Sequence, residues 1–241
     1  ISGYAVSIDD VNTLRKDIKD LNKGTENILY GKKWAYCGDS FSAGGYSMSE
    51  KTENDIMPPG SIYAGKNKVY GYIIADRNNM IIQDFAAGGR TISTPADGSF
   101  TNCFSLLYKN IDSDVDYITL YFGINDSHHA PGGTAGDGED NTGEIPIGTI
   151  EDDTINTFCG AYNVILGYLL KNYPFAHIGI IVSNGCDTPE YAEKTIQIAK
   201  KWGIPYIDLN EAPVMIRSQS SIVSAAAKNI VNLKQRISPT N

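Results

Sequence analysis

The chain alternates short apolar runs with segments of helical periodicity, and this alternation is the strongest constraint on its fold. The apolar runs are rich in Ile, Val and aromatic residues and are bounded by turn residues, which is typical of strands covered on both faces of a parallel sheet. Five such runs occur, at residues 34–37, 80–85, 117–122, 178–182 and 206–209. The sequence therefore predicts a doubly wound α/β fold, a flavodoxin-like five-stranded parallel sheet with helices on both faces.

Segments between the predicted strands place apolar residues at helical spacing. They lie at residues 69–74, 104–111, 158–170 and 191–202. The third ends at Tyr173-Pro174 and the fourth is followed by Gly203, which are residue types that stop helices. A last helix is predicted at residues 225–236.

No linker interrupts the 241 residues, so we expect one domain at residues 31–241 with a helical lead-in or stalk at residues 1–30. Apolar residues recur in the lead-in at a 3-4-3 spacing, at Val11, Leu14, Ile18 and Leu21. The pattern covers about two heptads, short of the roughly three to four that define a coiled coil. It fits a helix docked on its own domain and an oligomerising stalk equally well, so a homo-oligomer built through this helix stays open.

The net charge of −8 disfavours nucleic acid as a partner, because a phosphate backbone would be repelled over the whole surface. No run approaches the ~18 apolar residues of a membrane span, so no membrane segment is expected. The four cysteines, Cys37, Cys103, Cys159 and Cys186, show no metal-ligand spacing. We interpret them as reduced core residues and expect neither a metal site nor a cofactor.

Small and polar residues follow the first three predicted strands. They are Gly-Asp-Ser at 38–40, Ala-Ala-Gly-Gly-Arg-Thr at 86–91 and Gly-Ile-Asn-Asp at 123–126. In doubly wound folds ligands bind outside the carboxyl ends of the strands, so the three clusters are expected to meet at one edge of the sheet. Ser40 is then either a nucleophile or a polar residue that caps a following helix.

In this order the three clusters resemble the first three motif blocks of the SGNH, or GDSL-type, hydrolases, and the resemblance spans about residues 33–209. It implies a serine esterase in which Ser40 attacks an ester carbonyl. The resulting oxyanion would be bound by the backbone N–H groups of Ser40 and Gly89 and by the side-chain amide of Asn125. Gly88 lies beside Gly89, so the register of the second donor is open by one residue.

The fourth block of the family, Asp-x-x-His, is missing, since no Asp or His follows Leu209. In the family this histidine is the general base. The chain has His128, His129 and His177, of which His177 precedes a predicted strand and is expected at the opposite end of the sheet. His128 and His129 closely follow the third cluster, and we interpret them as substrate-binding residues rather than as the base. We expect the missing block to lie beyond Asn241.

By the same resemblance the substrate is an ester, with an acetylated polysaccharide favoured, although members of this fold also hydrolyse lipids and thioesters. No segment supplies an obvious apolar lid for a long acyl chain, which favours a short one. A glycine-rich acidic insertion at residues 127–150 follows the third block and is expected to shape the substrate pocket. Its carboxylates lack the ordered spacing of a calcium loop.

A binding module that kept the fold and lost catalysis is the alternative, because it would show the same missing block. Bacteriophage-borne members of the family have a run similar to Thr-Phe-Cys-Gly-Ala-Tyr-Asn at 157–163. This similarity implies a domain of a phage tail or receptor-binding fibre, a virion-associated or extracellular setting that suits either function.

Overall fold

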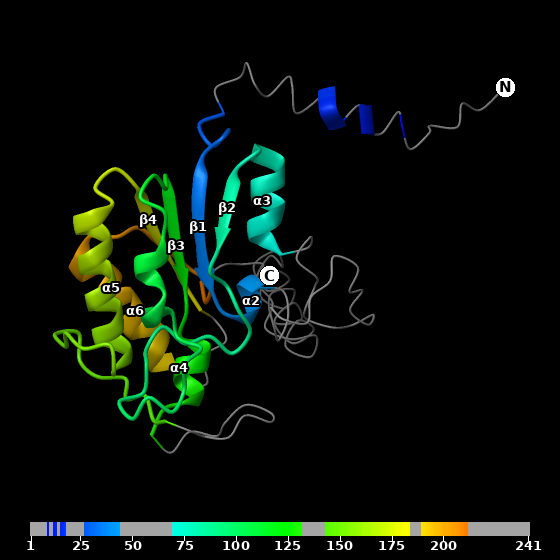
Figure 1. The fold of residues 1–241 in the computed structure, drawn as a ribbon. Helices are drawn as coiled ribbons and strands as arrows, with labels where there is room; N and C mark the ends of the chain where they lie inside the picture. Colours follow the sequence, from blue (N-terminus) through cyan, green and yellow to red (C-terminus); the bar gives the residue numbers. More distant parts are fainter. Residues whose placement is uncertain are drawn as a thin grey trace, which may run out of the picture.

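The computed structural model describes residues 27–43, 69–131, 143–183 and 189–211, together with residues 9, 12, 13 and 15–17. Its centre is a parallel sheet of five strands in the order β2-β1-β3-β4-β5 (Figure 1). The strands are β1 (Lys33–Gly38), β2 (Ile81–Asp84), β3 (Tyr117–Tyr121), β4 (His177–Val182) and β5 (Tyr206–Asp208). Each begins and ends within one residue of its predicted bounds, which confirms the predicted sheet.

Helices cover both faces of this sheet, as predicted. They are α2 (Ser40–Ala43), α3 (Tyr70–Asn78), α4 (Ile124–His128), α5 (Phe158–Asn172) and α6 (Pro189–Trp202). α3 lies on one face, and α5 and α6 lie together on the other (Figure 1). In this strand order the chain reverses its direction across the sheet between β1 and β3, so the switch point of the doubly wound fold lies there. Ser40 follows β1 and Asn125 follows β3, so both predicted site residues flank the switch point.

The segment at 104–111, which has helical spacing, forms two 3-10 turns, η3 (Phe104–Leu106) and η4 (Tyr108–Asn110), and no α-helix. Their hydrogen bonds join residues three apart in sequence. Phe104 and Tyr108 are both buried. The helix prediction was wrong because the apolar spacing indicates only which side chains are buried. Two short 3-10 turns bury these side chains as well as an α-helix would.

The main hydrophobic core lies between the sheet and the α5–α6 face, and a smaller core lies under α3. Side chains of β1 alternate between the two, with Ala35 and Cys37 in the main core and Trp34 and Tyr36 in the smaller one. Both faces of β1 are thus buried, which explains its uninterrupted apolar run. The cysteines of the described chain are buried free thiols, as predicted: Cys37, Cys103 and Cys159.

Some predictions concern residues that the structure does not describe. Of the predicted N-terminal helix, residues 9, 12, 13 and 15–17 are helical and exposed, but its apolar positions lie outside the described residues. Cys186 and the predicted helix at 225–236 also lie outside them. The division into a lead-in and a domain stays a prediction. Within the described ranges, no helix is both long and apolar enough to cross a bilayer.

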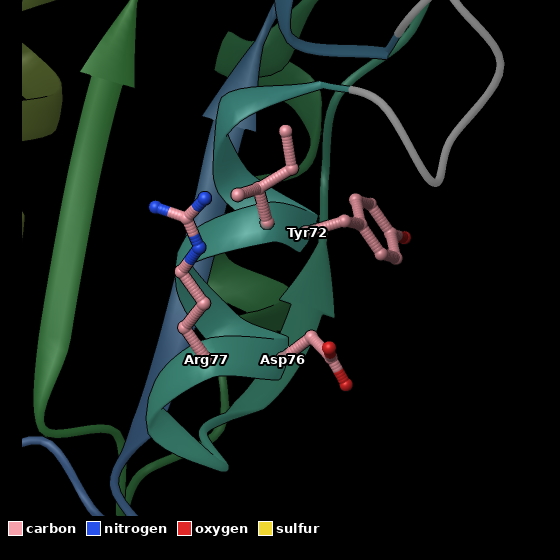
Figure 2. A pocket seen from close by; sticks show the side chains of 4 residues that line it. Tyr72, Asp76 and Arg77 are labelled. Carbon is pink, nitrogen blue, oxygen red and sulfur yellow. The ribbon is translucent and has the colours of Figure 1, made fainter. Parts of the chain in front are cut away.

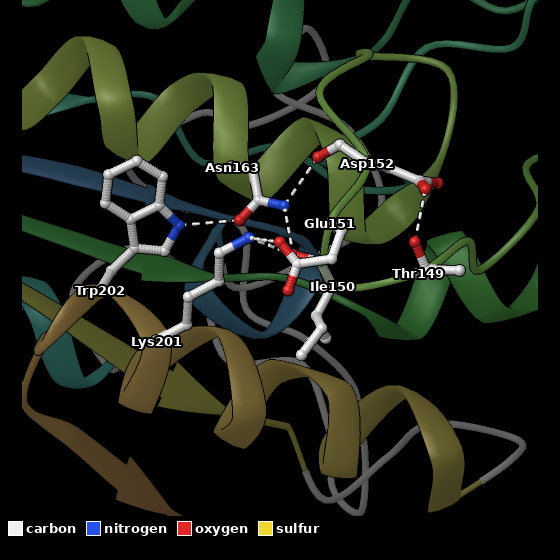
Figure 3. Close-up of polar contacts among 7 residues, drawn as sticks. All are labelled: Thr149, Ile150, Glu151, Asp152, Asn163, Lys201 and Trp202. Carbon is white, nitrogen blue, oxygen red and sulfur yellow. Dashed lines mark hydrogen bonds and ion pairs between the residues drawn. The ribbon is translucent and has the colours of Figure 1, made fainter.

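Asn163 ties the segment that precedes α5 to the end of α6 (Figure 3). Its Nδ2 donates to the carbonyl oxygens of Ile150 at 3.0 Å and Asp152 at 2.7 Å. Its Oδ1 accepts from Trp202 Nε1 at 2.7 Å. Because Asn163 is buried, these bonds are made away from water and fix the chain at residues 143–157 before it enters α5.

Replacing Asn163 with alanine is expected to lower the free energy of unfolding by about 3 kcal/mol, because Trp202 Nε1 and the Asp152 carbonyl oxygen lose their partner, while the Ile150 carbonyl oxygen keeps only the bond from Lys201 Nζ. Asn172→Ala is the matched control, since Asn172 Nδ2 donates to Tyr168 C=O at the exposed end of the same helix. Asn172→Ala should lower the free energy of unfolding by no more than about 0.5 kcal/mol. Urea unfolding measures both values, and equal losses in the two variants would contradict the stabilising role proposed for the Asn163 hydrogen bonds.

Candidate active site

Ser40 is the first residue of the helix α2, and Asp39 alone separates it from the end of β1. Asp39 caps this helix, since its Oδ1 accepts from Phe41 N–H at 2.9 Å. The carbonyl oxygen of Asp39 accepts from the N–H groups of Ser42 and Ala43. Ser40 is 8% exposed, and its hydroxyl makes no hydrogen bond with any residue that the structure describes. Asp39 therefore does the capping, and the Ser40 hydroxyl is left available.

The loop after β2 lies beside the end of β1, because Ala87 N–H donates to Gly38 C=O at 3.1 Å. The loop contains Gly88 and Gly89. Gly89 has a φ of +69°, a left-handed conformation that glycine adopts without strain. Within the described ranges, neither glycine uses its N–H in a hydrogen bond. Both N–H groups are free to act as donors, so the choice between the two stays open.

Arg90 and Asn102 hold this glycine loop in place. Arg90 Nε donates to Asn102 Oδ1 at 3.0 Å, and Arg90 Nη1 donates to the carbonyl oxygen of Phe85. Asn102 Nδ2 donates in turn to Gly88 C=O at 2.8 Å. Two of the five guanidinium N–H donors thus link the two ends of this loop to Asn102 and Phe85.

Asn125 lies in the first turn of α4, close after β3. Its Nδ2 donates to Arg90 C=O at 3.0 Å, which joins α4 to the glycine loop. A side-chain amide carries two N–H hydrogens, and this bond uses one of them. The other is left for a ligand at the same edge of the sheet.

Asp126 is fully buried and links the same two segments. Its carboxylate accepts from Ile92 N–H at 3.1 Å, from Ser93 N–H at 3.1 Å and from Ser93 Oγ at 2.7 Å. These bonds make Asp126 a structural residue that fixes the position of its neighbour Asn125. Sequence reasoning did not identify these partners, which lie 33 and 34 residues away, and the only signal was the place of Asp126 in the third motif block.

Two carboxyl groups are enclosed behind the turn that carries Ser40. Burial raises the pKa of Asp39 to about 7, and the nearby Asp126 carboxylate adds repulsion, while the bond from Phe41 N–H opposes the shift. Oδ2 of Asp39 is enclosed with no hydrogen-bond partner among the described residues. Burial also raises the pKa of Asp126, against the hydrogen bonds that it accepts. The turn therefore contains a carboxyl group that ionises near neutral pH.

Two of the three histidines are engaged elsewhere. His177 is the first residue of β4 and its ring stacks on Tyr117, with the ring centroids 5.1 Å apart. It lies at the amino end of the sheet, opposite the candidate nucleophile, as predicted. His129 is buried, its Nδ1 is 3.3 Å from Gly143 C=O, and its ring packs on Phe100. These contacts favour a structural role for His129.

His128, the other predicted substrate-binding residue, is half-buried at the last position of α4. It stays a candidate for a substrate contact. Of the predicted insertion at 127–150, residues 132–142 lie outside the described residues. The part that follows is anchored in the fold, because Ile145 is fully buried and its N–H donates to His129 C=O at 2.7 Å.

A cavity of about 420 Å³ lies along α3 and is lined by Tyr72, Ile73, Asp76 and Arg77 (Figure 2). All four residues belong to one helix, and none is a predicted site residue. The candidate site is the carboxyl edge of the sheet, where hydrogen bonds join the segments that follow β1, β2 and β3.

No family model matches the chain, and no curated protein matches it in sequence. Solved structures do match. A protein from Lactobacillus plantarum is 21% identical with a TM-score of 0.55, and the match covers 82% of this chain and 85% of that one. A putative GDSL-like lipase from Bacteroides ovatus is 17% identical with a TM-score of 0.53, covering 85% and 99%. Another from Bacteroides uniformis is 19% identical with a TM-score of 0.52, covering 84% and 96%.

At these identities the likeness concerns the fold. The chain has the doubly wound α/β fold of the SGNH hydrolases, as the sequence predicted.

Asp39→Asn is expected to change how stability depends on pH. Because folding raises the pKa of Asp39 from its ordinary value near 4 to about 7, the protonated carboxyl stabilises the fold below pH 4, and this contribution is lost as the pH rises to 7. The wild type should lose up to about 4 kcal/mol relative to the variant between pH 4 and pH 7. Urea unfolding across this range measures the difference.

Asp116→Asn is the control of opposite sign. The hydrogen bond from Lys32 lowers the pKa of Asp116, so its contribution is present above pH 4 and is lost only in more acidic solution. The difference between this variant and the wild type should be constant from pH 5 to pH 8. A constant difference for Asp39→Asn as well would contradict the raised pKa of Asp39.

Proposed function

We propose that the chain is the core of a serine ester hydrolase in which Ser40 is the nucleophile. The observation that supports this most strongly is that Asp39 already caps the helix that begins at Ser40, while the Ser40 hydroxyl has no hydrogen bond with any residue in the described ranges. A serine hydroxyl becomes a nucleophile when a base takes its proton, and a competing hydrogen bond would hinder that step. No described residue makes such a competing bond to Ser40.

The oxyanion formed by attack would be bound by the N–H groups of Ser40 and Gly89 and by the second amide hydrogen of Asn125. Donors of this kind are effective when they are fixed before the reaction. The bond from Asn125 Nδ2 to Arg90 C=O fixes the amide, and the bond from Ala87 N–H to the end of β1 brings the glycine loop alongside. Both observations support these roles.

A general base is also required. We propose that it is the histidine of an Asp-x-x-His block in sequence that follows Asn241, because residues 210–241 contain no histidine. His128, half-buried at the end of α4, is the alternative within the chain.

The proposed substrate is a short acyl ester, with an acetylated polysaccharide as the favoured class. This choice rests on the resemblance of the three motif blocks to the SGNH hydrolases.

The second candidate function is a binding module with the same fold and no catalysis. It is favoured by one observation, that no histidine in the described residues makes a hydrogen bond with the Ser40 hydroxyl. The similarity of residues 157–163 to phage-borne members of the family fits a receptor- or carbohydrate-binding domain of a tail fibre, with the N-terminal helix as its oligomerising stalk. That setting is compatible with either function.

A fluorophosphonate probe followed by intact-mass measurement tests the assignment of Ser40. The proposed longer chain, which continues past Asn241 and includes the Asp-x-x-His block, is called the parent polypeptide. It should gain one adduct, because its base can activate the serine, and residues 1–241 alone should react much more slowly. Ser40→Ala should abolish the adduct in both. An unreactive parent would favour the binding module, and an adduct that survives in the variant would exclude Ser40.

Asn125→Ala in the parent polypeptide is expected to lower kcat by about 100- to 1000-fold with little change in KM, because the lost donor acts on the oxyanion and not on the bound ester. Asn156→Ala is the matched control. Asn156 is also half-buried and its Nδ2 donates to a backbone carbonyl, that of Thr94 at 2.9 Å. Steady-state kinetics should give unchanged kcat for the control, and equal losses in the two variants would argue against an oxyanion role for Asn125.

A further inference from the structure

The helix that carries Ser40 needs support from outside itself. Its described part is residues 40–43, a single helical turn, and a turn of that length depends on contacts made outside it. Asp39 fixes its first N–H groups. Further partners lie on the α3 side of the sheet, where Tyr36 belongs to the smaller core.

Two tyrosine hydroxyls contact Ser42 of this helix. Tyr36 is fully buried, and its hydroxyl donates to Ser42 C=O at 2.9 Å. The hydroxyl of Tyr70, the first residue of α3, lies 3.1 Å from Ser42 Oγ. The rings of Tyr36 and Tyr70 pack edge to face with their centroids 5.2 Å apart. Ser42 is therefore fixed at both its backbone and its side chain.

Two glycines allow close packing around these hydroxyls. A Cβ added to Gly38 would lie 2.2 Å from Ser42 Oγ, so Ser42 sits directly against the end of β1. A Cβ added to Gly71 would lie 2.3 Å from the ring of Tyr36, so the first turn of α3 sits directly against that ring. Glycine at both positions permits contacts that any side chain would prevent. The first turn of α3, the Tyr36 ring and α2 thus form one continuous contact.

We propose that Tyr70 is a positioning residue for Ser40, whose hydroxyl fixes α2 through the side chain of Ser42. The inference rests on the proposed role of Ser40 as nucleophile. Tyr70 makes no contact with the reacting atoms. Burial raises the pKa of the Tyr70 hydroxyl, so it stays protonated and serves as a hydrogen-bonding group, not as a base.

The experiment compares four variants of the parent polypeptide: Tyr70→Phe, Ser42→Ala, the double variant of both, and Tyr72→Phe. Tyr72 is the matched control, because it lies on the same helix and its hydroxyl donates to Asp84 Oδ2 at 2.6 Å, on β2 and not on α2. Each change to Phe keeps the ring and removes one hydroxyl. Steady-state kinetics, urea unfolding and amide hydrogen exchange by NMR are measured for each variant.

Tyr70→Phe is expected to lower kcat by about 10-fold at unchanged KM, because small misplacements of a reacting group reduce rate more than binding. Its loss of stability should match that of Tyr72→Phe, which should keep its kcat. The double variant should be no slower than Ser42→Ala, since Tyr70 acts through Ser42. The amides of Ser42 and Ala43, bonded to Asp39 C=O, should exchange about 10-fold faster in Tyr70→Phe and should keep their exchange rate in Tyr72→Phe.

Equal kcat in Tyr70→Phe and Tyr72→Phe, or additive losses in the double variant, would overturn the inference. If the unchanged parent has no activity, the proposed function fails, and amide exchange alone then decides whether Tyr70 fixes α2. Unchanged exchange at Ser42 and Ala43 in Tyr70→Phe would overturn the inference in that case too.

Discussion

One buried carboxylate holds the candidate site together. Asp126 lies after β3 and accepts hydrogen bonds from Ile92 and Ser93, which follow β2, although β1 lies between these two strands in the sheet. The loops that follow parallel strands all lie at the carboxyl edge of the sheet, but the pairing of the strands does not hydrogen-bond these loops to each other. Asp126 supplies that bond, and the smaller contact from Asn125 to Arg90 depends on it for its alignment.

The Gly-Asp-Ser motif divides three physical tasks among three residues. Gly38 has no side chain, so Ser42 can pack against the end of β1. Asp39 accepts the N–H of Phe41 and caps the short helix. Because Asp39 does this, the hydroxyl of Ser40 is not needed as the helix cap, and it makes no hydrogen bond with another described residue.

β1 was predictable because its side chains enter a hydrophobic core on each face, so its run is continuously apolar. In β3 and β4 the alternate residues Ile118, Leu120, Ile178, Ile180 and Val182 enter the main core. The edge of the sheet that carries the site followed from strand order and the rule for ligands in doubly wound folds. The partners of Asp126 and the contact of Tyr70 with Ser42 were not predictable. They depend on side-chain geometry across 28 to 34 residues of sequence, which no local pattern records.

The strand order also determines when the site can form. β1 and β3 are direct neighbours, yet Lys33 N–H and the Asp116 side chain, which join them at their amino ends, are 83 residues apart in sequence. Closing so long a loop costs entropy before any pairing repays it, and folds built on such contacts fold slowly. During synthesis the turn at Ser40 can form early, but β1 keeps an unpaired edge until β3 has emerged. Asn125 on α4 is therefore the last of Ser40, Gly89 and Asn125 to be placed, and an unpaired apolar strand is exposed to aggregation in the meantime.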